Sequence, residues 1–207
     1  MSLETLKTKV GKLIEKAQSG GGEAKGLILS DFTGAYNKPK VADLRSFLPD
    51  KPNGWNSDGM FAYLFATALY TDLHTVYLPD WFTCFSGNMF QNCGNLTNLY
   101  GDTSNVTLIG GAAFSSCVKL TEFPYMPNLK ALYNSCFYNC KTLTEIKIYS
   151  TLTHFDSGTF NACTNITDIY VPWAEGAVGG APWGATNATI HYNTTYDENR
   201  NPIVTEV

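Results

Sequence analysis

The chain has 207 residues, enough for one domain with a substantial core, and a formal net charge of −4 at pH 7. Charged residues make up 15% and aromatic residues 14%, against a usual charged share of about a quarter. Nucleic acids and anionic membranes bind basic patches, and a bilayer span needs about 20 consecutive apolar residues; the sequence shows neither feature. We therefore expect no nucleic-acid partner and no membrane insertion.

Residues 1–22 predict an N-terminal helix followed by a glycine-rich joint. Apolar residues recur there at intervals of 3, 4, 3 and 4, the heptad stripe of a short coiled coil: Leu3, Leu6, Val10, Leu13 and Ala17. So short a helix needs a partner, and SGGGE (residues 19–23) forms a loose tether. We expect the helix to anchor and oligomerise the chain; packing on the chain's own repeats is the alternative. An apolar h-region is absent, so we expect no signal peptide.

Residues 23–59 predict a region that caps the N-terminal end of the following repeats. GLILSDF (26–32) has the composition of a strand, and KVADLRSFL (40–48) that of a short helix.

Residues 60–172 contain an internal repeat whose signature is Phe-x-x-Cys-x-x-(Leu/Ile)-Thr. Its phenylalanines, spaced 24, 23 and 23 residues apart, are Phe90, Phe114, Phe137 and Phe160. A period of roughly 20–29 residues with apolar columns predicts a solenoid, in which equivalent side chains of successive coils stack. LTEIKI and its equivalents predict short parallel strands, and VTLIG and LKALY predict a second, shorter strand per coil. AFSSC and CFYNC predict a single helical or 3₁₀ turn between them.

Four of the six cysteines occupy one position of the repeat: Cys93, Cys117, Cys140 and Cys163. A small, polarizable thiol suits a buried column, and a chain of this length does not need a disulfide framework. We favour buried thiols over disulfides, because the repeat position already accounts for burial; pairing of some cysteines stays open.

Residues 173–207 predict a C-terminal cap and tail. The last coil of a solenoid would expose an apolar cross-section, and the Pro-Trp pairs at Trp173 and Trp183 can cover it. ATIHY (188–192) predicts a final strand. We favour capping over ligand binding for both tryptophans.

The sequence carries no recognisable catalytic constellation. Its histidines, His74, His154 and His191, have no nucleophile at a known spacing, and no phosphate-binding loop, Gly-x-Ser-x-Gly or His-Glu-x-x-His motif occurs. Cysteines 23–24 residues apart form a ladder and not a tetrahedral zinc site. We expect no catalytic residues, no metal and no cofactor, and hence no enzyme.

Alignment of the coils places two columns of side chains on the outer face of the main strands. The first column is Thr75, Asn98, Glu122, Glu145 and Asp168, and the second is Tyr77, Tyr100, Pro124, Lys147 and Tyr170. Tyrosines beside carboxylates suit recognition, with flat rings for sugar C–H faces or apolar groups and carboxylates for hydroxyls or basic groups. The alternative is a solvated sheet face on which tyrosines shield the backbone.

The repeat resembles the BspA-like leucine-rich repeats, whose pattern runs Ile-Gly-x-x-Ala-Phe-x-x-Cys-x-x-Leu-Thr-x-Ile-x-(Ile/Leu)-Pro. LIGGAAFSSCVKLTEF (108–123) and DSGTFNACTNITDIYVP (156–172) carry the likeness, which covers about residues 60–172. The resemblance implies an α/β leucine-rich-repeat solenoid, here preceded by the N-terminal helix, and a role in surface adhesion. NLYGD (98–102) and EFPYM (122–126) depart from the pattern and lose the regular strand end, and Cys136 replaces its small alanine.

Two terminal stretches resemble structural proteins encoded by phages and prophages of Gram-positive bacteria. They are the leader GKLIEKAQSGG (11–21) and the segment VPWAEGAVGGAPWGATNATIHYN (171–193). The resemblance implies a virion protein of the tail or fibre kind that displays the repeats for host-surface recognition. Its expected partners are other virion proteins, copies of itself and a bacterial surface glycan or protein. A purely architectural virion protein and a bacterial cell-surface adhesin are the alternatives.

Overall fold

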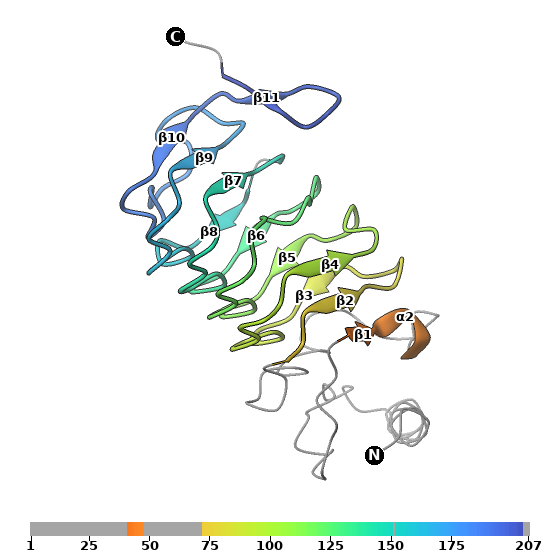
Figure 1. The fold of residues 1–207 in the computed structure, drawn as a ribbon. Coiled ribbons are helices and arrows are strands. Elements are labelled where there is room, and N and C mark those ends of the chain that lie inside the picture. Colours follow the sequence, from red (N-terminus) through yellow and green to blue (C-terminus); the bar gives the residue numbers. More distant parts are fainter. Residues whose placement is uncertain (1–40, 48–71, 151, 205–207) are drawn as a thin grey trace, which may run out of the picture.

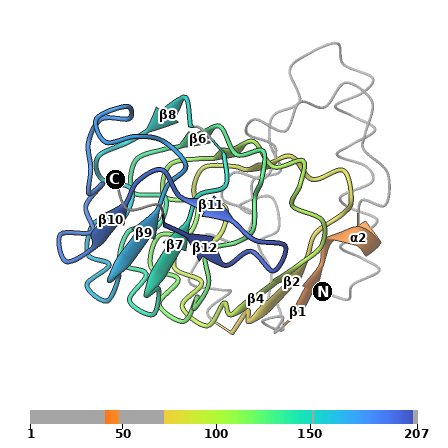
Figure 2. The same cartoon turned by 90° about the horizontal axis from the view of Figure 1, so that it is seen from above.

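The structure is a computed structural model that describes residues 41–47, 72–150 and 152–204 (Figures 1 and 2). Its elements are β1 (Val41–Asp43), α2 (Leu44–Phe47), β2 (Thr75–Tyr77), β3 (Cys84–Phe85), β4 (Asn98–Tyr100), β5 (Leu108–Ile109), β6 (Ala131–Leu132), β7 (Glu145–Lys147), β8 (His154–Phe155), β9 (Asp168–Tyr170), β10 (Thr189–His191), β11 (Thr195–Tyr196) and β12 (Pro202–Ile203). The predicted helix over residues 1–22 and the predicted strand at 26–32 lie outside the described residues.

Successive coils stack side by side and form two rows of parallel strands (Figure 1). One row is the four-stranded sheet β3-β5-β6-β8, and the other holds the main strands, in the sheets β1-β2-β4 and β7-β9-β10. Every pair in these rows is parallel. The predicted solenoid with two strands per coil is confirmed, and the described residues form a parallel β-solenoid more than an α/β fold.

The repeat phenylalanines stack through the interior. The ring centroids lie 5.4 Å apart for Phe90 and Phe114, 5.1 Å for Phe114 and Phe137, and 5.8 Å for Phe137 and Phe160. All four side chains are fully buried. The separations follow the spacing of paired strands, about 4.8 Å, so each coil contributes one ring to a continuous column.

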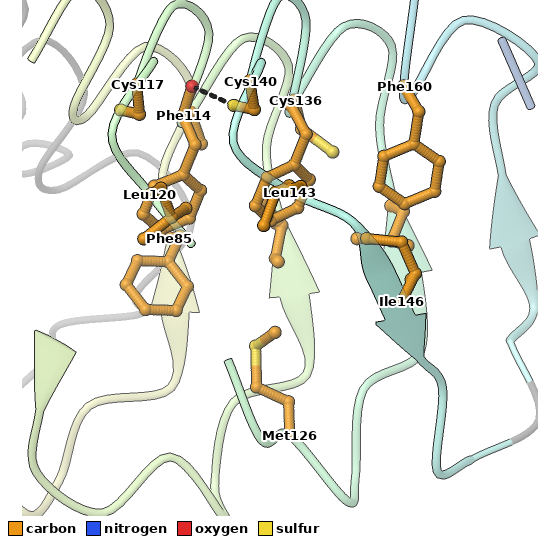
Figure 3. Packing of buried hydrophobic residues seen from close by; sticks show 14 of the residues in the cluster. Phe85, Phe114, Cys117, Leu120, Met126, Cys136, Cys140, Leu143, Ile146 and Phe160 are labelled. Atoms are coloured by element: carbon orange, nitrogen blue, oxygen red, sulfur yellow. Dashed lines mark hydrogen bonds between the residues drawn. The ribbon is translucent and has the colours of Figure 1, made fainter. Parts of the chain in front are cut away.

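The cysteines form a second buried column, and all six are free thiols (Figure 3). The Sγ of Cys117 donates to the carbonyl oxygen of Phe90 at 3.3 Å, Cys140 to that of Phe114 at 3.1 Å, and Cys163 to that of Phe137 at 2.9 Å. Each thiol therefore bonds to the preceding coil. The expectation of buried thiols without disulfides is confirmed, and the repeated bond explains why cysteine suits this position better than alanine.

The connections at the repeat signature are single turns, each closed by a hydrogen bond between residues three apart, such as that from the Cys117 N–H to the Phe114 carbonyl oxygen at 3.0 Å. Of the two predicted forms, this spacing is that of a 3₁₀ turn and not of an α-helical turn. The residue before each stacked cysteine has a left-handed backbone, with φ of 65° at Asn92, 62° at Ser116, 59° at Asn139 and 63° at Ala162. A left-handed residue interrupts a right-handed helix after one turn. Within the described residues, α2 is the one helix.

The row of main strands is broken at residues 120–126, which we call the interrupted segment. Within the described residues, no backbone–backbone hydrogen bond joins residues 121–125 to a neighbouring coil. Pro124 lacks an N–H, and the hydroxyl of Thr142 reaches across to the carbonyl oxygens of Val118 and Leu120, at 3.0 and 2.7 Å. The loss of strand predicted from EFPYM is confirmed. The same prediction for NLYGD is wrong, because Asn98–Tyr100 forms β4, a strand as long as the other main strands.

The N-terminal described residues extend the main row by one strand. The predicted helix over 40–48 is only partly present, because Val41–Asp43 pairs with β2 and the helix begins at Leu44. Ladder hydrogen bonds to β2 outweigh helix propensity in these three residues.

The last coil ends in a layer of aromatic side chains. Trp183 is fully buried and stacks on Phe155 with centroids 4.2 Å apart, and Trp173 meets the same ring edge-on at 6.5 Å. The strand predicted from ATIHY is β10, which pairs with β9. Beyond it, the antiparallel pair β11–β12 lies over the solenoid end (Figure 2), and the Tyr196 hydroxyl donates to the carbonyl oxygens of Ile148 and Tyr170.

Candidate ligand-binding surface

The outer columns predicted on the main strands are in register within each of the two sheets. Tyr77 pairs with Tyr100 upstream of the interrupted segment, and Lys147 pairs with Tyr170 downstream. Thr75 likewise faces Asn98, and Glu145 faces Asp168, so Glu122 and Pro124 are the two predicted members that lie in no strand. The alignment of coils therefore placed the remaining residues correctly in space; whether they bind a ligand is a separate question.

The upstream half of this surface is a stack of a cation and two rings. Tyr77 and Tyr100 lie 5.2 Å apart with planes 28° from parallel, and the Arg45 guanidinium carbon lies 4.4 Å from the centre of the Tyr77 ring. Because β1 and β4 flank β2 on opposite sides, Arg45 and Tyr100 cover opposite faces of Tyr77. Tyr100 is 49% exposed.

Thr75 is not presented to solvent, contrary to its place among the predicted ligand-binding residues. It is only 6% exposed. Its Oγ1 lies 2.8 Å from His74 Nδ1 and accepts a hydrogen bond from Asn98 Nδ2 at 3.4 Å. The Thr75 hydroxyl therefore makes its hydrogen bonds within the protein and is not available to a ligand.

The downstream half is a network of polar pairs. Lys147 Nζ lies 2.6 Å from Glu145 Oε1, and His191 Nε2 lies 2.8 Å from Asp168 Oδ1. His191 also stacks on the Tyr170 ring at 4.4 Å with planes 13° apart. Hydrogen bonds from His191 and then from the Thr167 hydroxyl lower the pKa of Asp168, which therefore stays ionised at neutral pH.

These stacks change the expected chemistry of the tyrosines. The rings lie nearly parallel to those of neighbouring coils, so their faces pack along the row and the edges and hydroxyls meet solvent. The ring face of Tyr77 that packs on Tyr100 and the face of Tyr170 that packs on His191 are therefore not available to a ligand, because adjacent side chains at strand spacing cover one another.

Two members of the surface were missed from the sequence. His191 continues the second column in β10, and alignment of ATIHY (188–192) with TDIYV (167–171) would have placed it there. Arg45 comes from α2, outside the repeat, so no periodic signal pointed to it.

Chemistry beyond binding is not indicated in the part of the chain that the structure describes. Within it, no group of three or more His, Cys, Asp or Glu side chains could hold a metal ion. His154 lies 3.2 Å from Asp156 on the other strand row, apart from the His191–Asp168 pair. Among residues 41–47, 72–150 and 152–204, no helix has the length and apolar character of a membrane span.

Parallel strands in two rows, one pair per 23- or 24-residue coil, define a leucine-rich-repeat solenoid, a fold that typically serves as a binding scaffold. Residues 83–175 match the family described as "BspA type Leucine rich repeat region" in six copies.

Two solved structures are similar in fold. A leucine-rich-repeat protein of T. pallidum superposes with a TM-score of 0.58 at 20% identity, over 75% of this chain and 70% of that one. A leucine-rich-repeat protein of Bacteroides ovatus ATCC 8483 gives a TM-score of 0.53 at 17% identity, over 60% of this chain and 31% of that one. A search of curated proteins found no match.

Proposed function

We propose that the chain is a non-enzymatic recognition protein that binds a bacterial surface ligand through the outer columns of its main strands. The observation that carries this proposal is the register of those columns, which holds Tyr77 against Tyr100 and Lys147 against Tyr170 on a rigid ladder. Side chains held in place by the backbone lose little entropy on binding. The BspA-type repeats support a surface role, because proteins of this family are often found on cell surfaces.

We further propose that the chain is displayed on a phage virion. The support is the resemblance of residues 11–21 and 171–193 to phage structural proteins. In this arrangement the heptad stripe of residues 1–22 joins several copies to each other or to other virion proteins. Several copies on one particle convert weak single contacts into avidity.

The bacterial cell surface is the second candidate location, favoured by the BspA-type repeats themselves. A purely architectural virion role is supported by ion pairs between side chains of the outer columns, such as that of Lys147 with Glu145, because paired side chains are less available to a ligand.

Mass spectrometry of purified particles and of the cell-wall fraction distinguishes display on the virion from display on the bacterial surface. The protein should co-purify with particles if it is a virion component. Detection in cell walls alone would contradict virion display.

Recognition is tested by binding of the fluorescently labelled full chain to a panel of Gram-positive bacteria. The double variant Tyr100→Ala, Tyr170→Ala should bind host cells at least about tenfold more weakly, because it removes both aromatic stacks of the surface. Tyr138→Ala is the matched control, since Tyr138 is 42% exposed but lies outside the main strands. Equal binding by the wild type and the double variant would contradict the proposal.

Oligomerisation is tested separately by light scattering of the full chain and of a chain lacking residues 1–22. We expect the full chain to be an oligomer and the shortened chain a monomer. A monomer in both samples would contradict the proposed role of residues 1–22 in oligomerisation.

A further inference from the structure

Tyr100 is the last ring of the upstream stack, and its two faces differ. One face packs on Tyr77, at a centroid distance of 5.2 Å. No other described side chain makes a ring contact with Tyr100, whose side chain is 49% exposed. The face that points along the row, away from Tyr77, is therefore open.

The open face exists because the next coil is the interrupted segment. A regular coil would place a strand residue beside Tyr100 at about 4.8 Å, as Tyr100 itself sits beside Tyr77. The alignment of coils puts Pro124 at that position, but residues 121–125 lie in no strand and make no backbone bond to β4 within the described residues. Figure 1 shows the resulting gap in the row of arrows between β4 and β7.

A hydrogen-bonding group lies next to this open ring. Asn98 is two residues before Tyr100 on β4, so both side chains leave the same face of the strand. Its Nδ2 donates to Thr97 and Thr75, while its Oδ1 accepts no hydrogen bond from a described residue. An amide oxygen accepts hydrogen bonds from hydroxyls.

Three cations of this surface are in contact with other protein groups, so a neutral ligand needs none of them. The ammonium group of Lys147, on the next main strand, is neutralised by Glu145 at 2.6 Å. Arg45 lies on the far side of Tyr77, two side chains away along the stack. Arg200 packs on the interrupted segment itself, with its guanidinium carbon 3.8 Å from the centre of the Tyr125 ring.

We propose that Tyr100 and the interrupted segment form a carbohydrate subsite, in which a neutral pyranose ring stacks on the open face of Tyr100. Its hydroxyls donate to Asn98 Oδ1. The inference rests on the proposed function and names the ligand class of the same surface. A sugar ring has an apolar C–H face that packs on an aromatic ring and a polar rim that needs acceptors, which is the combination found here.

The subsite is held in place before a ligand binds. Arg45 and Tyr77 support Tyr100 from behind, and Gly101 lets the chain leave β4 directly after it. Gly101 has φ of +131°, and a Cβ built on it would lie 2.7 Å from the Leu78 carbonyl oxygen. Only glycine combines an unstrained positive φ with the absence of a Cβ that would clash with Leu78. Gly101 therefore lets β4 end at Tyr100.

The test is an array of neutral hexose and N-acetylhexosamine oligosaccharides, with poly(glycerol phosphate) as the anionic comparison. The strongest binder is then titrated by calorimetry against the full chain and three variants. Tyr100→Ala should weaken binding about tenfold, because the stacking face is lost. Tyr100→Phe should retain affinity within about twofold, because it keeps that face. Tyr138→Ala, at an exposed tyrosine elsewhere on the solenoid, should bind as the wild type does. Thermal melting establishes that each variant is folded.

Equal affinity of Tyr100→Ala and wild type would overturn the subsite, as would binding to poly(glycerol phosphate) alone or to none of the oligosaccharides. Loss of binding in both Tyr100→Ala and Tyr100→Phe would also overturn it, because stacking would not be the cause. Wild-type binding to whole bacteria distinguishes the two failures: if it persists, the recognition function stands and only the subsite is wrong.

Discussion

The rings of Phe114 and Phe137 lie face to face, with centroids 5.1 Å apart and planes 7° from parallel. They belong to successive coils and are 23 residues apart in the chain. Neither coil can bury its own ring, because each ring is covered by those of the coils before and after it. The stability of each coil therefore depends on its neighbours.

Phe137→Ala should lower the free energy of unfolding by about 3–5 kcal/mol, because it opens a cavity in the middle of the stack. Phe137→Leu should cost less, since it fills most of the volume. Urea denaturation followed by circular dichroism measures both. The adjacent Tyr138→Ala serves as control, and a cost as large as that of Phe137→Ala would show that the column is not what supports this coil.

The buried thiols predict a loss of stability in alkali. Burial raises the pKa of Cys93 from 9.0 to about 12, and it raises the pKa of Cys117 and Cys136 as well. Above pH 9 the unfolded chain releases protons that the folded protein keeps, so the free energy of unfolding falls as pH rises from 9 towards 12. It is unaffected by these groups below 9. The expected slope is about 1.4 kcal/mol per pH unit for each thiol.

Denaturant titrations at several pH values between about 8 and 10 measure that slope. Cys93→Ala should be less stable at every pH but should show a shallower slope, because one titrating group is gone. An unchanged slope would mean that Cys93 ionises equally in the folded and unfolded states.

Gly101→Ala should destabilise the protein more than Gly176→Ala. Both glycines have a positive φ, +131° at Gly101 and +80° at Gly176, so alanine is strained at each by about 1–3 kcal/mol. A Cβ at Gly101 also meets the Leu78 carbonyl oxygen at 2.7 Å, whereas one at Gly176 has no atom within 4 Å. Melting temperatures of the two variants isolate the clash, and equal losses would contradict the close approach at Gly101.

Ala162→Gly should stabilise the protein by about 1 kcal/mol. Ala162 is exposed and has φ of 63°, a conformation that costs an alanine but not a glycine. Ala174→Gly is the matched control, since Ala174 is exposed without a positive φ and glycine there only adds entropy to the unfolded chain. Denaturant midpoints should move in opposite directions; a fall in both would contradict the strain at Ala162.

The sequence by itself determined the solenoid, because its side-chain columns recur at a fixed period. Phe114 and Cys117 have equivalents at the same positions in three other coils, so their stacking could be predicted from spacing alone. The break at Pro124 could be predicted too, because proline lacks a ladder donor. The outer columns were aligned correctly for the same reason.

Only the tertiary structure decided which ring faces of the outer tyrosines are covered by neighbouring side chains. Tyr77, Tyr100 and Tyr170 are equivalent in the alignment, yet Tyr77 is covered on both faces and Tyr170 packs on His191, while Tyr100 keeps one face open. The tyrosines differ because a different side chain lies next to each ring, and that side chain comes from another coil or from outside the repeat.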